Sequence, residues 1–257
     1  RLLNQAFAAF EAAGYLERQA VITVNLGIAY RNLGLHRRAR RLHLKADAIY
    51  RRTGARAVPM NNAWNLVLGE IEMGHLAAAR ARLDEAVTYM AATHQESRFP
   101  LVASLPYVRL ATAAGDERAA LRHYKHMATL VHNPESAAYE INVLANIGQT
   151  NLALGNARAA LTSTRRGTTK HRAHDLAKLV NLEPAMAWWQ HSRALQANGQ
   201  AGAAREALER AYQFMLTGIG SLSDEGLRRN YLNKNEAHRE IIRAWLKDER
   251  RRRLSQE

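Results

Sequence analysis

Two pairs of histidines have a spacing that can hold a metal ion. His123 and His126 lie three residues apart, as do His171 and His174, so each pair faces one side of a helix. Neither pair has a carboxylate at a matching step in the sequence. We therefore expect these histidines on the solvent-exposed surface, and we predict no metal site.

No motif for catalysis or cofactor binding accompanies the histidines. The sequence contains no G-x4-G-K-[ST] phosphate loop, no H-E-x-x-H zinc signature and no G-x-S-x-G nucleophile turn. The segment Gly218-Ile-Gly220 lacks a third glycine at the required distance and a preceding strand. We predict a protein that is not an enzyme and uses no cofactor.

The composition favours a helical protein without disulfides. Of the 257 residues, 47% are hydrophobic, 7% are aromatic and none is cysteine. No apolar run approaches the ~18 residues that a membrane helix needs, and no secretory signal opens the chain, so we expect a cytoplasmic location. We interpret the net charge of +14 as an arginine-rich solvated surface, with local clusters at residues 37–41 and 250–253.

A glycine followed five residues later by alanine recurs five times. The pairs are Gly34 and Ala39, Gly74 and Ala79, Gly115 and Ala120, Gly155 and Ala160, and Gly199 and Ala204, with glycines 40, 41, 40 and 44 residues apart. Glycine ends a helix readily because it adopts the left-handed conformation at little cost. Alanine lets two helices cross closely. The pattern therefore predicts repeated helix–turn–helix units.

Two further positions recur with the same period. Seven residues after each alanine stand Ala46, Ala86, Met127, Gly167 and Ala211, of which four are small. Eight residues before each turn glycine stand Leu26, Leu66, Tyr107, Ile147 and His191, which are mostly large and apolar. We expect these positions to form contacts within the helix pairs.

The unit from Asn25 to Tyr50 resembles the tetratricopeptide repeat. It has Asn-Leu-Gly, a tyrosine three residues later, then the turn glycine and two spaced alanines. The resemblance implies an all-α, right-handed solenoid of antiparallel helix pairs, with 34-residue cores at 20–53, 60–93, 101–134, 141–174 and 185–218 and a half repeat at 1–14. Departures include Val67 and Val108 in place of glycine and Glu70 in place of tyrosine. The period near 40 also exceeds the usual 34.

The tail at 219–257 departs from the period, and we expect it to form C-terminal capping or linker helices after the array at 1–218. Ser223 is the candidate N-cap of a short helix near 224–232. A second helix has an apolar face with Ile241, Ile242, Trp245 and Leu246. Within the array, Pro106 falls inside an expected first helix and should kink or restart it.

The resemblance implies a ligand groove lined by the first helix of each pair. The expected groove residues are side-chain amides, two tryptophans and two arginines, which suit hydrogen bonding to an extended peptide, apolar anchoring and capture of a carboxylate or phosphate. They are Asn25, Asn65, Trp64, Arg109, Asn146, Gln149, Trp189, Gln190 and Arg193.

These features predict an interaction scaffold that binds a peptide, a protein segment or a small effector. Long-period arrays of this kind are similar to the sensor or scaffold regions of bacterial LuxR-type regulators and multidomain adenylate cyclases. We therefore expect a bacterial regulatory fragment, followed by an output domain in a longer chain. The alternative is a basic α-solenoid that binds nucleic acid. It requires a continuous arginine stripe with stacking aromatics, whereas we expect residues 37–41 on the outer surface without interleaved aromatics.

Overall fold

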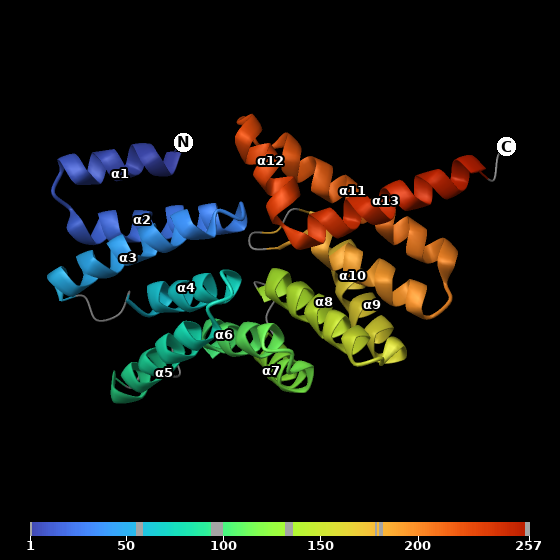
Figure 1. Cartoon of the computed structure of the whole chain (residues 1–257), viewed down its shortest axis with the longest axis horizontal. Coiled ribbons are helices and arrows are strands. Elements are labelled where there is room, and N and C mark those ends of the chain that lie inside the picture. Colours follow the sequence, from blue (N-terminus) through green and yellow to red (C-terminus); the bar gives the residue numbers. More distant parts are fainter. Residues whose placement is uncertain are drawn as a thin grey trace. The chain divides into compact units, whose positions relative to one another are not determined.

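The computed structural model describes residues 2–54, 59–93, 100–131, 136–177, 179 and 182–254. All regular structure in these ranges is helical (Figure 1). The helices are α1 (Leu2–Ala12), α2 (Leu16–Asn32), α3 (His36–Thr53), α4 (Pro59–Glu72), α5 (Leu76–Thr93), α6 (Pro100–Ala113), α7 (Glu117–Leu130), α8 (Ala137–Ala153), α9 (Ala157–Ala173), α10 (Pro184–Ala197), α11 (Ala201–Gly220), α12 (Glu225–Lys234) and α13 (Glu236–Leu254). The prediction of an all-α fold made of helix pairs is confirmed.

The chain divides into two compact units, Arg1–Asp116 and Glu117–Glu257. In the first unit α1 packs on α2, α2 on α3, α3 on α4, α4 on α5, and α6 on both α4 and α5. In the second unit α7 packs on α8, α8 on α9, and α10 on α8, α9 and α11. The boundary falls in the turn between α6 and α7, inside the third predicted repeat. A single array over 1–218 stays a prediction.

The predicted turn glycines all adopt the left-handed conformation. Their φ angles are 72° at Gly34, 81° at Gly74, 75° at Gly115, 76° at Gly155 and 73° at Gly199. At the fourth of these turns the Gly155 N–H donates to the Leu152 carbonyl at 3.0 Å, and the Asn156 N–H donates to the Asn151 carbonyl at 2.8 Å. These bonds satisfy carbonyls at the end of α8 and reverse the chain into α9.

We expect Gly155→Ala to lower the free energy of unfolding by about 1–2 kcal/mol, because a Cβ is disfavoured at this φ. The matched control is Gly202→Ala in α11, where a Cβ meets nothing within 4 Å and φ lies outside the left-handed region. Urea unfolding followed by circular dichroism measures both variants. Equal midpoints for the two would contradict this explanation of the turn.

The predicted crossing residues are buried. Ala39, Ala79, Ala120, Ala160 and Ala204 have no more than 3% of their surface exposed. The second series is buried as well: Ala46, Ala86, Met127, Gly167 and Ala211. At Gly167 a Cβ would lie 3.4 Å from the Leu144 Cβ and 3.5 Å from the Ile141 carbonyl oxygen. The small residue at Gly167 therefore allows a close approach of α9 to α8.

The two C-terminal helices cover the last helix pair of the second unit. Ile241 on α13 is fully buried, and the Trp245 ring stacks on Tyr212 of α11 with centroids 4.5 Å apart. Leu246 is 53% exposed, so the predicted apolar face of α13 is only partly covered. A capping role for α12 and α13, which pack on α11 and on each other, is consistent with a solenoid's need to cover its last apolar face.

Two local predictions require correction. The N-cap of α12 is Asp224 rather than Ser223, because the Asp224 Oδ1 accepts the Leu227 N–H at 2.8 Å and its backbone is extended, with ψ 129°. At Pro106 the predicted restart is wrong, because α6 is continuous from Pro100 to Ala113, whereas the predicted kink stays a prediction. A proline inside a helix removes a single backbone donor, and the surrounding helix persists despite that loss.

Candidate binding surface

The first unit does not bring its four predicted groove residues onto one open surface. Asn25 on α2 is exposed, but Trp64 and Asn65 on α4 are buried, and Trp64 belongs to a core cluster with Val67 and Leu83. Arg109 on α6 is partly exposed and lies 3.7 Å from a carboxylate oxygen of Glu72. Of these four predicted groove residues, only Asn25 and Arg109 are therefore accessible to a ligand.

The second unit places four of its five predicted groove residues, partly exposed, on two helices that pack together. Asn146 and Gln149 lie on α8, and Trp189 and Arg193 lie on α10. We call these four residues the α8–α10 face. The fifth, Gln190, is 99% buried, and its Oε1 accepts a hydrogen bond from Arg193 Nη1 at 3.3 Å. Gln190 therefore orients Arg193 rather than facing a ligand.

The two amides of the α8–α10 face retain unused hydrogen-bonding groups. Asn146 Nδ2 donates to the Asn142 carbonyl in the same helix at 2.7 Å. Asn146 Oδ1 and the whole Gln149 amide have no partner among the described residues, although both side chains are half-buried. Neither residue contributes to the buried side-chain atoms without a partner in the described ranges, so these amide groups are open to solvent and available to a ligand.

The tryptophan and arginine of this face meet a carboxylate from the cap. Trp189 Nε1 donates to Glu240 Oε2 of α13 at 2.8 Å, and Arg193 Nη1 lies 3.9 Å from the same oxygen. The Arg193 guanidinium also lies 5.9 Å from the centre of the Trp189 ring. The side chains of Arg193 and Glu240 are both 38% exposed, so this cluster is open to solvent.

A buried carboxylate on α8 holds two cations of α9. Glu140 of α8 accepts a hydrogen bond from Arg166 Nη2 at 2.8 Å and another from the Lys170 ammonium. Burial by itself raises the pKa of Glu140, but the hydrogen bonds and positive charges of Lys170 and Arg166 outweigh it, so the pKa lies below its usual range. The carboxylate therefore stays ionised at neutral pH and holds the helix that carries Asn146 and Gln149.

Thr164 of α9 lies where α8, α9 and α10 meet. Its Oγ1 lies 3.0 Å from both the Ala160 carbonyl oxygen and Nδ1 of His191 on α10. Its methyl group occupies the space in which a Cβ on Gly148 of α8 would lie. The side of α8 at Gly148 therefore faces α9. At 100° per residue, Asn146 lies about 160° and Gln149 about 100° around the helix from Gly148.

One prediction about the histidine pairs is wrong. No group of three or more potential ligands that could hold a metal occurs in the described residues. His171 is fully buried instead of exposed. Its Nδ1 accepts the Trp188 indole N–H at 3.0 Å, and its Nε2 lies 3.1 Å from the Ala177 carbonyl oxygen, to which it donates. These two bonds require a neutral ring with the proton on Nε2.

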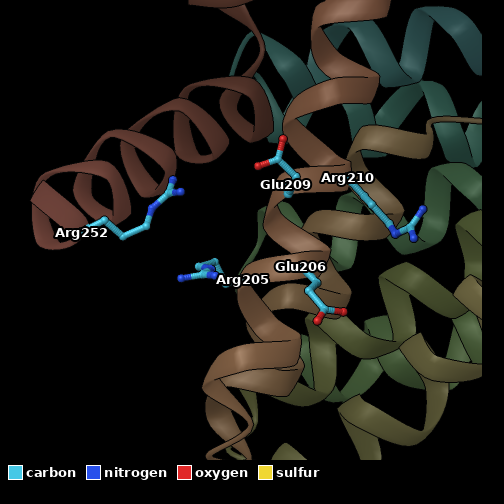
Figure 2. Close-up of a pocket in the computed structure, with 5 residues that line it drawn as sticks. All are labelled: Arg205, Glu206, Glu209, Arg210 and Arg252. Carbon is cyan, nitrogen blue, oxygen red and sulfur yellow. The ribbon is translucent and has the colours of Figure 1, made fainter. Parts of the chain in front are cut away.

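A cleft of about 460 Å³ lies between α11 and the end of α13. Figure 2 shows Arg252 of α13 on one side and four residues of α11 on the other. The lining residues are Arg205, Glu206, Glu209, Arg210 and Arg252. This lining mixes three arginines with two glutamates.

The sequence analysis did not predict two acidic residues, Glu240 and Glu70, that make contacts between helices. Glu240 is separated from Trp189 by 51 residues, and no repeat pattern relates the two positions. Glu70 of α4, where the repeat family prefers tyrosine, accepts hydrogen bonds from Arg40 at 2.8 Å and His75 at 2.9 Å. An acidic residue at a position where the family prefers tyrosine was the signal available in the sequence for that ion cluster.

The chain is similar to solved structures of tetratricopeptide-like repeat proteins. A point variant of a putative kinesin light chain from Podospora anserina, with nearly identical TPR-like repeats, matches with a TM-score of 0.54 at 18% identity, over 80% of this chain and 99% of that one. The Rap conjugation gene regulator of the plasmid pLS20, in complex with the Phr* peptide, matches with a TM-score of 0.61 at 13% identity, over 97% of this chain and 73% of that one.

No protein-family model and no curated protein sequence matches the chain. At the identities of the structural matches, the similarity establishes the fold, which is a helical repeat of the tetratricopeptide type. In the part of the chain that the structure describes, no helix has the length and apolarity needed to cross a membrane.

Proposed function

We propose that this chain is a non-enzymatic scaffold whose α8–α10 face binds an extended peptide or protein segment. The observation that carries the proposal is the half-buried Gln149 amide, which has no partner among the described residues, beside the free Oδ1 of Asn146. An extended peptide presents one N–H and one C=O per residue, and a side-chain amide can bond to both.

The remaining members of the α8–α10 face would select the side chains of the bound segment. The Trp189 ring provides apolar area for an aliphatic or aromatic side chain. Arg193 can bind a carboxylate of the ligand, which would then compete with Glu240 for the guanidinium. We therefore expect a preferred peptide with an acidic residue next to a large apolar one.

The similarity to the Rap regulator supports a peptide as the ligand class, since that protein was solved with the Phr* peptide. We also propose a regulatory role for the binding event, in which the ligand favours one arrangement of the helices and so controls an output domain in a longer chain. A small effector at the same face is a narrower form of this proposal, and a bacterial cytoplasm remains the expected setting.

Binding to peptides selected from a random 12-residue display library tests the proposal. Peptides enriched on the immobilised protein are synthesised, and their Kd values are measured by fluorescence anisotropy. We expect Gln149→Ala to weaken binding about 3- to 10-fold, the effect of one hydrogen bond, and Arg193→Gln to weaken it about 10-fold or more. Neither variant should unfold the protein, because Gln149 has no partner among the described residues and Arg193 is partly exposed.

Gln213→Ala on α11 is the matched control, because Gln213 is an exposed amide whose one bond is to Glu209 in the same helix. It should leave the Kd of the selected peptides unchanged. Failure to enrich any peptide, or equal affinity of all three variants, would overturn the proposed function.

A further inference from the structure

One face of α3 is made almost entirely of cations. The exposed residues of this helix are Arg37, Arg38, Arg41, Lys45, Ala48, Arg51 and Arg52. At 100° per residue, all of these except Arg51 fall within an arc of about 100°. We call Arg37, Arg38, Arg41, Lys45 and Arg52 the α3 cationic stripe. It belongs to the first unit, whereas the α8–α10 face belongs to the second.

No carboxylate among the described residues neutralises the stripe. Other arginines of the first unit have acidic partners: Arg40 and Arg82 meet Glu70, Arg109 meets Glu72, and Arg51 meets Asp47. The five members of the stripe have no ion pair within the described ranges. Their charge is therefore available to an external anion, and because they are exposed, little is lost when they exchange water for that anion.

Two members of the stripe make cation–π contacts with aromatic rings of neighbouring helices. The Arg38 guanidinium lies 4.3 Å from the centre of the Tyr30 ring of α2, and the Lys45 ammonium lies 4.6 Å from the centre of the Phe7 ring of α1. Such cation–π contacts hold a side chain without removing its charge. Arg38 and Lys45 are therefore held by these rings while their charges stay available.

The chemistry of the stripe favours phosphate over protein as the anion. Four of its five members are arginines, whose planar guanidinium binds phosphate oxygens in pairs. Protein–protein interfaces depend on buried aromatic or aliphatic anchors, and Ala48 is the one apolar residue exposed on this helix. Nucleic-acid interfaces can depend on phosphate contacts alone.

The geometry of the stripe favours a duplex over a single strand. From Arg37 to Arg52 the helix rises about 22 Å, and phosphates on one strand of B-DNA follow each other about every 3.4 Å along the axis, so several lie within reach. Single-strand binding relies on exposed aromatic rings that stack with bases, and the stripe exposes none. We propose that the α3 cationic stripe binds the phosphate backbone of double-stranded nucleic acid without reading its sequence.

The salt dependence of duplex binding tests this proposal. Anisotropy of a labelled 20-base-pair DNA is titrated with the whole chain between 50 and 200 mM KCl. Five phosphate contacts predict a slope of log K against log[salt] near −4.5, which corresponds to an affinity loss of about 500-fold over that range. The variant Arg37→Gln/Arg41→Gln/Arg52→Gln should have a slope near −1.8 and a loss of about 12-fold.

A control variant with the same change in net charge shows whether duplex binding depends on the stripe or only on the net positive charge of the protein. Arg118→Gln/Arg122→Gln/Arg158→Gln removes three exposed arginines from α7 and α9 of the second unit. It should retain the slope near −4.5, and equal losses in the two triple variants would overturn the proposal. Tighter binding to polyglutamate or to vesicles of anionic lipid than to duplex of equal charge would also overturn it, because the ligand would then be an acidic protein or a membrane.

Measuring peptide binding on the same variants separates a failure of this proposal from a failure of the proposed function. The triple variant of the stripe should keep the wild-type Kd for selected peptides, and Gln149→Ala should keep the wild-type salt slope for duplex. Either binding activity can thus fail without the other.

Discussion

Lowering the pH from 7 to 5 is expected to destabilise the protein, and His191 alone should account for about 2 kcal/mol of that loss. Burial lowers the pKa of His191 to about 4, and the positive charges of Arg172 and Arg165 add to the shift. Burial also lowers the pKa values of His43, His171 and His238. Between pH 6.5 and 4 the unfolded chain therefore binds more protons than the folded one, and stability falls as pH falls.

The equivalent positions of other repeats suggest the variant that tests this prediction. Leu26 and Leu66 stand at the position that His191 occupies in the last repeat, so His191→Leu replaces a titrating residue with one that the fold accepts elsewhere. Urea unfolding at pH 7 and pH 5 should show that this variant loses about 2 kcal/mol less than the wild type over this interval. The low pKa values of Glu70 and Glu140 act only below this range. An identical pH dependence in wild type and variant would contradict the neutral, buried state of His191.

Replacing Gly148 with alanine is expected to lower the free energy of unfolding by about 2–3 kcal/mol, the cost of overpacking a close helix contact. A Cβ at Gly148 would overlap Cγ2 of Thr164 on α9. Thr164→Ser removes that methyl group and keeps the hydroxyl. The next atoms that the new Cβ would meet are the Ala160 carbonyl oxygen at 3.4 Å and the Thr164 Cβ at 3.6 Å, both in ordinary contact range.

The double variant makes this prediction specific to one contact. In a double-mutant cycle, Gly148→Ala/Thr164→Ser should be more stable than the sum of the single changes by about 1–2 kcal/mol. The control is Gly69→Ala in α4, where a Cβ meets nothing within 4 Å. That change should leave stability unchanged or raise it by up to about 1 kcal/mol, because alanine favours helix over glycine. Additive single effects would show that Thr164 does not oppose the new methyl group.

The fold could be predicted from the sequence because its contact points require particular residue types. A left-handed helix end strongly favours glycine, and Gly34, Gly74, Gly115, Gly155 and Gly199 all have positive φ. A close helix crossing requires a small side chain, and the alanine five residues after each glycine is buried. Each requirement involves residues close in sequence, so it remains visible as a period.

The candidate surface was harder to predict because exposure depends on neighbouring elements. Asn65 and Asn146 occupy the same position in their repeats, yet Asn65 is buried on α4, whereas Asn146 remains half-exposed on α8. The burial of His171 depends on Trp188, which lies 17 residues away on the next helix. Glu240 reaches Trp189 from the non-repeating tail. Such contacts arise where successive repeats, or the last repeat and the tail, pack on each other. The residue spacing within one repeat does not encode them.

The location of a bound peptide is the most direct test of the proposed function. A selected peptide that carries a photoreactive benzophenone group is bound to the protein and irradiated, and the cross-linked residues are identified by mass spectrometry. We predict cross-links within α8 and α10, near Gln149 and Trp189, that disappear when unlabelled peptide is added in excess. Specific cross-links confined to the second helices α7, α9 and α11, or to the first unit, would contradict the assignment of the α8–α10 face as the binding surface.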